Sequence, residues 1–285
     1  MRKYIFIAAS ILLLSSCGKE IQIGGDLEMH FRFGYPETRA TFQAFEAGDE
    51  VSLFAVQWNG ETQMPLQVSG NYLNNEKITF DGTTWNPTRT LYWADAPCDF
   101  YALYPFQEEI NPIEAYPFAV TPDQNGDGYE ASDLLFAYSE NISRSEGPVS
   151  MRFKHMMSKV KVNLVKGPSF EGDFPNDVVA HIYNTVTSCK VNMTAGSIEK
   201  DAFGNHQTIT MKKISNEQFE AVVVPQNIEM RTPLIELTMG GIAYLLETSL
   251  SFRPGYVHTI TVTLNTSPDQ EQIEISIDPS QEGWN

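Results

Sequence analysis

The sequence is poor in cysteine, in basic residues and in long apolar runs. Only three cysteines occur among 285 residues, too few for a disulfide framework or a four-thiolate zinc site, so a packed core must supply the stability. Lysine and arginine number 19 against 36 acidic residues, and the formal charge of −17 repels phosphate backbones. We therefore expect no nucleic-acid partner.

Residues that carry catalysis or bind metals are also sparse. Even the nearest histidines, His181 and His206, are too far apart for the helical spacing of a zinc protease, and the chain has no phosphate-binding glycine loop, nucleophile elbow or paired-cysteine motif. His258 lies at an apolar position of its alternating segment, which favours a core histidine over a ligand. The same holds for Cys98 and Cys189, which favours buried thiols over an interdomain disulfide. We therefore expect that the protein has no enzymatic activity and binds no cofactor.

Apolar residues, by contrast, are plentiful. They make up 42% of the chain and charged residues only 19%, which indicates a globular core. Sixteen prolines, 19 glycines and 12% aromatic residues favour strands and turns over a helical bundle. Alternating segments recur at a spacing of roughly ten residues, and Gly240-Gly241 predicts a hairpin between 235–239 and 242–246. The sequence therefore predicts an all-β protein with two tandem β-sandwiches and short helical turns.

A restart of the alternating pattern near Gly147-Pro148 predicts the boundary between the two sandwiches. Proline-rich loops precede it, with at most one short helical turn, near Ser132 to Ala137. The expected segments are a signal peptide at 1–16, an N-terminal segment at 17–39, sandwich domains at 40–150 and 151–264, and a linker with a terminal strand at 265–285.

The start of the chain has the features of an export signal. Arg2 and Lys3 precede an apolar run from Ile5 to Leu14, which is about half as long as a bilayer-spanning helix requires. Leu14-Ser15-Ser16-Cys17 then resembles the lipobox of bacterial lipoproteins, in which the cysteine becomes the lipidated first residue. We expect a lipid anchor on Cys17 that holds a globular domain at a membrane. The alternative is ordinary secretion with an incidental cysteine.

Two short segments near the ends of the chain have the pattern of half-buried strands. Apolar residues occupy alternate positions in both: Leu27, Met29, Phe31 and Phe33 near the start, and Ile273, Ile275 and Ile277 near the end, followed by Trp284. Burying the three isoleucines contributes about 5–9 kcal/mol, and ordering five residues costs about 5–10 kcal/mol. Each segment is either a permanent strand of its own domain or one that a second molecule can exchange.

One loop resembles half of a calcium site. Asp123, Asn125, Asp127 and Gly128 match the first half of a calcium-binding loop, in which alternate oxygens converge on the cation. Leu134 stands where the completing bidentate carboxylate belongs, so these residues are a weak calcium candidate, and a solvated turn is the favoured interpretation.

Aromatic residues gather in the middle of the first half, where they either pack between sheets or stack on sugars. They are Tyr92, Trp93, Phe100, Tyr101, Tyr104 and Phe106. The second use defines an alternative function: a lipid-anchored glycan-binding module with Trp58, Trp85 and Trp93 as exposed stacking platforms.

Several short motifs, in order along nearly the whole chain, together resemble the fimbrillin family of Bacteroidetes, which includes Mfa-like lipoproteins. Besides the lipobox, they are Thr38-Arg39-Ala40, Leu91-Tyr92-Trp93, Asp99-Phe100-Tyr101-Ala102 with Tyr104-Pro105, Ser132-Asp133-Leu134-Leu135 with Ala137, Phe153 with His155, Ser158-Lys159-Val160, Val224-Pro225-Gln226, and Phe252 with Pro254-Gly255.

The resemblance implies two transthyretin-like sandwiches on an outer-membrane lipoprotein of the cell surface that builds fimbriae as a subunit, or as an accessory or tip adhesin. It also implies cleavage between Arg39 and Ala40, which removes the leading strand and opens a groove for a strand from a neighbouring subunit. Residues 27–33 would be the displaced strand, and Ile273, Ile275, Ile277 and Trp284 would belong to a donor strand. The expected partners are other fimbrial subunits, the outer membrane through Cys17, and a receptor on a host or bacterial surface.

Overall fold

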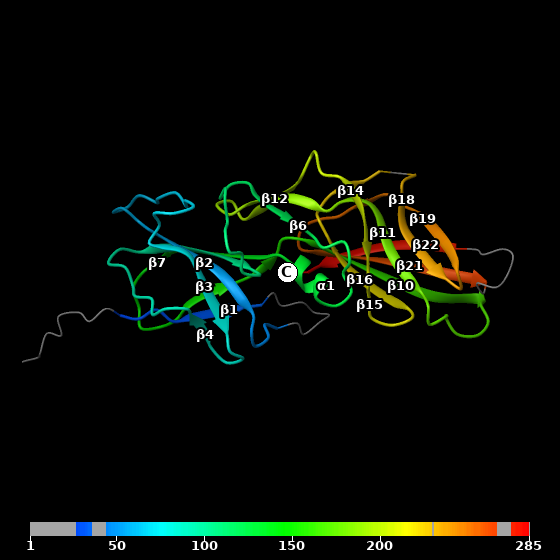
Figure 1. Cartoon of the computed structure of the whole chain (residues 1–285), viewed down its shortest axis with the longest axis horizontal. Coiled ribbons are helices and arrows are strands. Elements are labelled where there is room, and N and C mark those ends of the chain that lie inside the picture. Colours follow the sequence, from blue (N-terminus) through cyan, green and yellow to red (C-terminus); the bar gives the residue numbers. More distant parts are fainter. Residues whose placement is uncertain (1–26, 36–43, 230, 267–274, 285) are drawn as a thin grey trace, which may run out of the picture.

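The computed structural model describes residues 27–35, 44–229, 231–266 and 275–284. These residues form an elongated molecule in which two groups of strands follow one another along the long axis, with one short helix, α1 (Asp127–Ser132), near the middle (Figure 1). The prediction of an all-β protein is therefore confirmed, whereas the transthyretin-like layout stays a prediction. No helix among these residues is long and apolar enough to cross a bilayer.

The first half of the chain builds one sheet of eight strands, in the order β8-β1-β4-β3-β2-β5-β7-β9. Its strands are β1 (Phe31–Gly34), β2 (Glu50–Gln57), β3 (Leu73–Phe80), β4 (Trp85–Pro87), β5 (Cys98–Tyr104), β7 (Leu135–Ile142), β8 (Val149–Arg152) and β9 (Lys154–His155). The central strands β2 and β5 are buried on both faces, so their alternating side chains enter two different cores.

The second half contains a five-stranded sheet, a four-stranded sheet and two small sheets. The five-stranded sheet has the order β15-β16-β10-β21-β22: β15 (Lys212–Lys213), β16 (Gln218–Val223), β10 (Ser158–Ser169), β21 (Tyr256–Thr266) and β22 (Ile275–Gly283). The four-stranded sheet has the order β14-β11-β18-β19: β14 (His206–Thr210), β11 (Val179–Val186), β18 (Pro233–Met239) and β19 (Ile242–Glu247). The small sheets are β13 (Ser197–Lys200), β12 (Ser188–Asn192) and β6 (Tyr116–Ala119), and β17 (Asn227–Ile228) with β20 (Leu250–Ser251).

The predicted hairpin at Gly240-Gly241 is present. Met239 pairs with Ile242, and the two glycines between them have φ values of 57° and 77°. A two-residue turn that matches strand twist needs positive φ at both positions, which glycine supplies without strain. The sequence therefore located this turn and both of its strands correctly.

The two halves of the chain interleave near the predicted boundary. Strands β8 and β9 still belong to the first sheet, and the second group begins only at Ser158. β6, from the first half, pairs with β12 from the second, and Gln124 exchanges two hydrogen bonds with the backbone of Val222. The stretch that precedes β7 thus packs on the second group, and the division at residue 150 stays a prediction.

The helical turn lies upstream of its predicted position. Ser132 ends α1, and Leu135 already begins β7, so the segment Ser132 to Ala137 is not a helix. The reason is burial: Leu134 and Leu135 are fully buried in the two different cores, which requires the alternation of a strand.

The residues expected in the core are there. His258 is fully buried, its Nε2 accepts a hydrogen bond from the Arg253 N–H at 3.1 Å, and burial lowers its pKa. Cys98 and Cys189 are buried free thiols, and burial raises their pKa values to about 11 and about 12. A thiol that stays protonated at neutral pH is a poor nucleophile.

Candidate functional site

Strand β1 lies inside the first sheet, between β8 and β4, and not at its edge. It runs parallel to β8 with four residue pairs in register, from Phe31↔Val149 to Gly34↔Arg152. It runs antiparallel to β4 with a single pair, Phe31↔Trp85. A strand from the beginning of the chain therefore fills a gap between strands that come much later in the sequence.

Backbone hydrogen bonds extend this attachment on both sides of β1. Four of them join residues 27–34 to β8 and to the segments that flank the paired strands: Met29 N–H to Leu91 O (2.8 Å), Trp93 N–H to Leu27 O (2.9 Å), Val149 N–H to His30 O (2.7 Å) and Phe153 N–H to Gly34 O (3.0 Å). The segments on both sides of β1 form backbone hydrogen bonds with it. Loss of residues 27–34 would therefore leave unpaired backbone N–H and C=O groups along two edges of the sheet.

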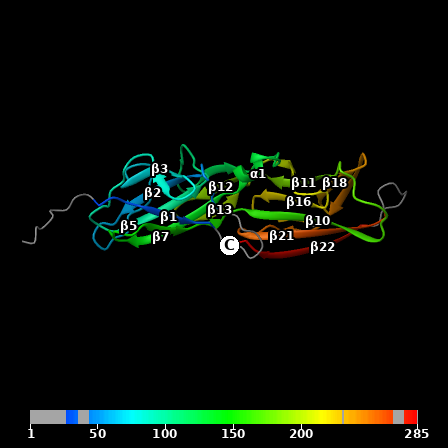
Figure 2. The ribbon, with the colours of Figure 1, turned by 90° about the horizontal axis from the view of Figure 1, so that it is seen from below.

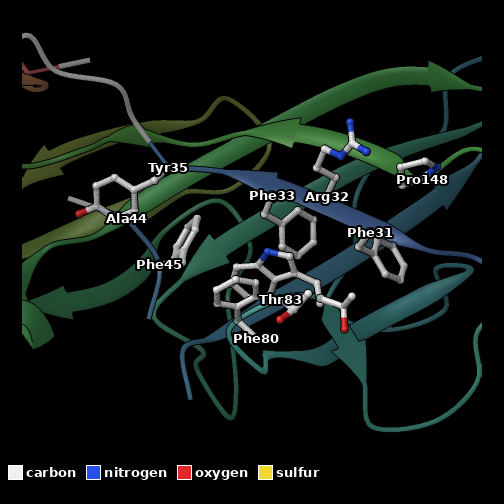
Figure 3. A pocket seen from close by; sticks show the side chains of 11 residues that line it. Phe31, Arg32, Phe33, Tyr35, Ala44, Phe45, Phe80, Thr83 and Pro148 are labelled. Atoms are coloured by element: carbon white, nitrogen blue, oxygen red, sulfur yellow. The ribbon is translucent and has the colours of Figure 1, made fainter. Parts of the chain in front are cut away.

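The alternation predicted for residues 27–33 is present in the structure. Met29, Phe31 and Phe33 have exposed fractions of only 1%, 6% and 6%, and Arg32 between the last two is exposed. Figure 3 shows Phe31 and Phe33 on the side of β1 that faces Phe80, with Arg32 on the opposite side. The leading strand therefore presents one apolar face to the core.

Aromatic rings line the site that receives this face. The ring centroid of Phe33 lies 4.9 Å from that of Trp85 and 5.7 Å from that of Phe153. Phe45 packs edge-to-face on the same two rings, at 4.9 Å and 5.6 Å. An open pocket of about 430 Å³ adjoins these residues, with Phe80 on its wall (Figure 3). We call the site occupied by residues 27–35 the β1 groove.

Tyr35 is the last described residue of the leading segment, and it forms a polar contact. Its hydroxyl donates to Asp133 Oδ2 at 3.2 Å, and Asp133 Oδ1 lies 2.7 Å from His155 Nδ1. Burial, with Asp133 as a further cause, raises the pKa of Tyr35 far above its usual value. Asp133 is 6% exposed, so this carboxylate depends on protein groups for its hydrogen bonds.

The C-terminal strand β22 is attached differently. It is the edge strand of the five-stranded sheet, and all nine of its residues pair with β21, from Leu264↔Ile275 to Tyr256↔Gly283. In Figure 2, β22 lies along the outer side of β21. Of the predicted donor residues, Ile275 and Ile277 are in this ladder, and Ile273 lies outside the described residues.

Trp284 follows β22 and is the largest fully buried side chain among the described residues. Its indole stacks on His155 with ring centroids 3.6 Å apart and an interplanar angle of 10°, and its backbone N–H donates to Gly255 O at 2.8 Å. The buried Lys159 ammonium lies 5.8 Å from the same ring and 2.7 Å from Glu220 Oε2. Trp284 therefore closes a core that β22 alone would leave open.

The two terminal segments meet at one histidine. Tyr35 contacts the His155 ring edge-to-face at 5.8 Å, and Trp284 stacks on the same ring. In the sequence, His155 stands out only as part of the motifs that resemble the family. No pattern there predicts a contact between His155 and either end of the chain. The isolated two-residue strand β9 gives no periodicity that would reveal such a contact.

Besides Ile273, the predicted site residues Cys17, Arg39 and Ala40 lie outside the described residues. The structure thus neither supports nor opposes lipidation of Cys17 or cleavage after Arg39, and both stay predictions.

The weak calcium candidate forms a hydrogen-bonded turn. Asp123 Oδ1 accepts hydrogen bonds from the backbone N–H and the side-chain amide of Asn125, at 3.0 and 3.2 Å, and Asp127 begins α1. Within the described ranges, no group of three or more His, Cys, Asp or Glu residues could hold a metal ion. Asp123 Oδ1 therefore stabilises the turn that leads into the helix.

The glycan-binding alternative requires exposed tryptophan platforms, and this requirement fails for two of the three tryptophans. Trp85 and Trp93 are only 7% and 6% exposed, because their rings pack in the core beneath β1. Trp58 is half-buried, and its Nε1–H donates to the buried Asp99 at 2.7 Å. Of the wider aromatic group, Phe100 and Tyr101 are also buried. Tyr92, by contrast, is 44% exposed, so packing in the cores is the use of the four buried rings, Trp85, Trp93, Phe100 and Tyr101.

Comparison with known proteins identifies the class to which this architecture belongs. The model of the fimbrillin-like family matches residues 38–284. The chain therefore belongs to the fimbrillin-like family, in agreement with the resemblance seen in its motifs. No curated protein matches the chain.

Solved structures share the fold over almost the whole chain. A candidate cell adhesion protein from Bacteroides uniformis is 21% identical and has a TM-score of 0.69, over 91% of this chain and 100% of the other. A candidate cell adhesion protein from Bacteroides ovatus has a TM-score of 0.70 at 16% identity, over 92% and 98%. The tip fimbrial protein Mfa3 from Porphyromonas gingivalis, with a C-terminal truncation, has a TM-score of 0.53 at 11% identity, over 91% and 100%.

Proposed function

We propose that the protein is a non-enzymatic surface subunit of a fimbrium that is first anchored in the outer membrane through Cys17, then released from this anchor by cleavage after Arg39, and finally completed by a strand from a neighbouring subunit. The observation that carries this proposal is the position of β1. A strand that precedes Arg39 in sequence fills an aromatic groove between β8 and β4, which both follow it. A cut beyond Tyr35 therefore breaks the covalent link between the strand and the rest of the protein and leaves both the strand and the groove intact.

The physical consequence of removing β1 favours assembly. The empty groove would expose Trp85, Phe153 and the other rings of the core, and it would leave unpaired N–H and C=O groups on β8 and along residues 91–93. Both kinds of exposure are costly in water. An extended strand from another subunit relieves both, because its main chain restores the hydrogen bonds and its alternate side chains refill the groove.

The position of Phe45 supports cleavage before it. Phe45 follows Arg39 in the sequence, whereas β1 precedes it. The ring of Phe45 packs on Trp85 and Phe153. After cleavage this ring stays with the body of the protein as part of the groove wall. The strand leaves, while the lining that an incoming strand would contact remains.

Mass spectrometry of the surface-exposed native protein tests the processing step. We expect a mature N-terminus at Ala40 in assembled material and a lipidated N-terminus at Cys17 in material that is not yet assembled. Arg39→Gln and Arg39→Lys should both block an arginine-specific cut and leave the chain out of fimbriae; the lysine variant keeps the charge and thus separates specificity from electrostatics. Fimbriae built from chains that still begin at Cys17 would refute the proposal.

Donation of the C-terminal segment to a neighbour remains part of the prediction. Deletion of residues 265–285 should stop self-assembly if this segment is the donor. The structure adds that this deletion also removes Trp284 from the core and opens the edge of β21, so a loss of assembly counts only if the variant stays folded.

A further inference from the structure

We propose that the β1 groove selects a donor strand with bulky aromatic side chains at alternate positions and a tyrosine at its end, so that another protein fills it in preference to the C-terminal strand of a second copy of this chain. This inference rests on the proposed function and names the kind of partner that the groove fits. It concerns the side chains that occupy the groove, whereas the proposed function concerns only the fact of exchange.

The first argument is the shape of the groove. Phe33 enters between Trp85 and Phe153, at 4.9 and 5.7 Å, and the ring of Phe31 lies 5.8 Å from that of Phe33. These spacings are typical of favourable aromatic pairs, which contribute beyond the area they bury. Branched aliphatic side chains at the same positions would leave the walls of the groove without these contacts.

The second argument is the polar end of the groove. Position 35 supplies a hydroxyl that donates to Asp133, and a ring that packs edge-to-face on Phe45 at 5.0 Å and on His155 at 5.8 Å. Asp133 is almost fully buried, so removing the donor would leave one of its oxygens without that hydrogen bond. A donor strand that ends in tyrosine satisfies both the carboxylate and the aromatic pocket.

The third argument is that the chain's own tail matches neither requirement in the two registers that place its isoleucines in the groove. When Ile273, Ile275 and Ile277 are placed at positions 29, 31 and 33, Pro279 falls at position 35, where it has neither a hydroxyl nor an aromatic ring. Moving the tail by two residues places Pro279 at position 33 and Gln281 at position 35. Neither register provides a ring for the space between Trp85 and Phe153.

The fourth argument is that the tail is already bound within its own domain. Nine residue pairs join β22 to β21, and Trp284 is 1% exposed against His155. Donation would open the edge of β21 and empty the site of Trp284. A strand from another protein fills the groove without these two losses.

The test uses the full chain with Cys17→Ser and a site for a sequence-specific protease between residues 36 and 43. The folded protein is cut, so that the leading segment stays bound without a covalent link, and labelled peptides compete for the groove. The peptides are residues 25–36, the same peptide with Phe31→Ile, Phe33→Ile and Tyr35→Pro, and residues 271–285. An Arg32→Gln peptide is the matched control, because Arg32 is exposed.

The 25–36 peptide and its Arg32→Gln control should exchange in with equal affinity. The triple variant should bind about 1,000-fold more weakly, since it loses three aromatic rings and each ring that is lost costs about tenfold. The 271–285 peptide should not compete at concentrations that saturate the groove with the 25–36 peptide. Equal binding of the tail peptide or the triple variant would overturn the inference and leave the proposed function standing. Failure of the 25–36 peptide itself to enter would refute strand exchange, and the inference with it.

Discussion

The two terminal strands differ in a way that their positions in the sheets do not reveal. β1 lies inside a sheet, yet it has four residue pairs on one side and one on the other. β22 lies at an edge, yet all of its nine residues are paired, and Trp284 fastens its end. An inner strand can thus have fewer paired residues than an edge strand. We expect the number of contacts that would be lost, and not the place in the sheet, to decide which strand can exchange.

The largest expected effect is at the C-terminal end. Trp284→Ala should lower the free energy of unfolding by about 3–5 kcal/mol, because it empties a site against His155 in the interior. Denaturant titration measures this loss. Phe203→Ala is the matched control, since Phe203 is 93% exposed and its loss should change stability by less than about 0.5 kcal/mol. If both variants lowered the free energy of unfolding equally, the claim that β22 and Trp284 form part of the core would be contradicted.

A somewhat smaller and local effect is expected at β1. Phe33→Ala should weaken the attachment of β1 by about 2–4 kcal/mol, since it removes a ring from between Trp85 and Phe153. Hydrogen exchange should therefore speed up at Phe31–Gly34 and change little in the β21–β22 ladder. Arg32→Gln, on the exposed side of the same strand, should leave both rates unchanged. Faster exchange in both regions would mean that the two strands open together.

Acid should lower the stability of the protein through His258, which lies in β21. Burial lowers the pKa of His258 below 6.5, so the unfolded chain binds its proton more readily than the folded chain. The free energy of unfolding should therefore fall as pH decreases from about 6.5 through the folded-state pKa. His258→Gln should reduce this slope in denaturant titrations repeated across pH, and His206→Gln, at an exposed position, should keep it. An unchanged slope in His258→Gln would assign the acid sensitivity elsewhere.

The smallest effects concern two thiols that report on the two cores. Cys98 shares a core with β1, and Cys189 shares the other core with Trp284. In a Cys17→Ser background, both should resist thiol reagents at neutral pH, because burial raises their pKa values to about 11 and about 12. Phe33→Ala should accelerate labelling of Cys98 more than of Cys189, and Trp284→Ala should do the reverse. The same acceleration at both thiols would show that the cores do not open separately.

Local patterns predicted those parts of the fold that local chemistry determines. Alternation identified the buried face of residues 27–33, and two glycines identified the turn between β18 and β19. Both depend on side chains within a few residues of one another. The helical turn was misplaced because the sequence does not show that Leu134 and Leu135 enter different cores.

Contacts between distant segments could not be predicted in this way. The pairing of β6 with β12 and the stacking of Trp284 on His155 join residues that alternation treats as unrelated. The glycan-binding alternative placed Trp85 and Trp93 at the surface, and the sequence could not reject it for the same reason, since their burial depends on β1 and on the strands that follow. A period of two shows that a strand has an inner face, and it does not show which segment covers that face.

Native-state hydrogen exchange on the intact chain tests the central comparison most directly. We expect the amides of Phe31–Gly34 to exchange through a partial opening that costs less free energy than the opening of the β21–β22 ladder, which should exchange only as the second core unfolds. A specific cut between residues 36 and 43 should widen this difference by speeding exchange in β1 alone. Exchange of β22 before β1, or of both in a single global opening, would contradict the account.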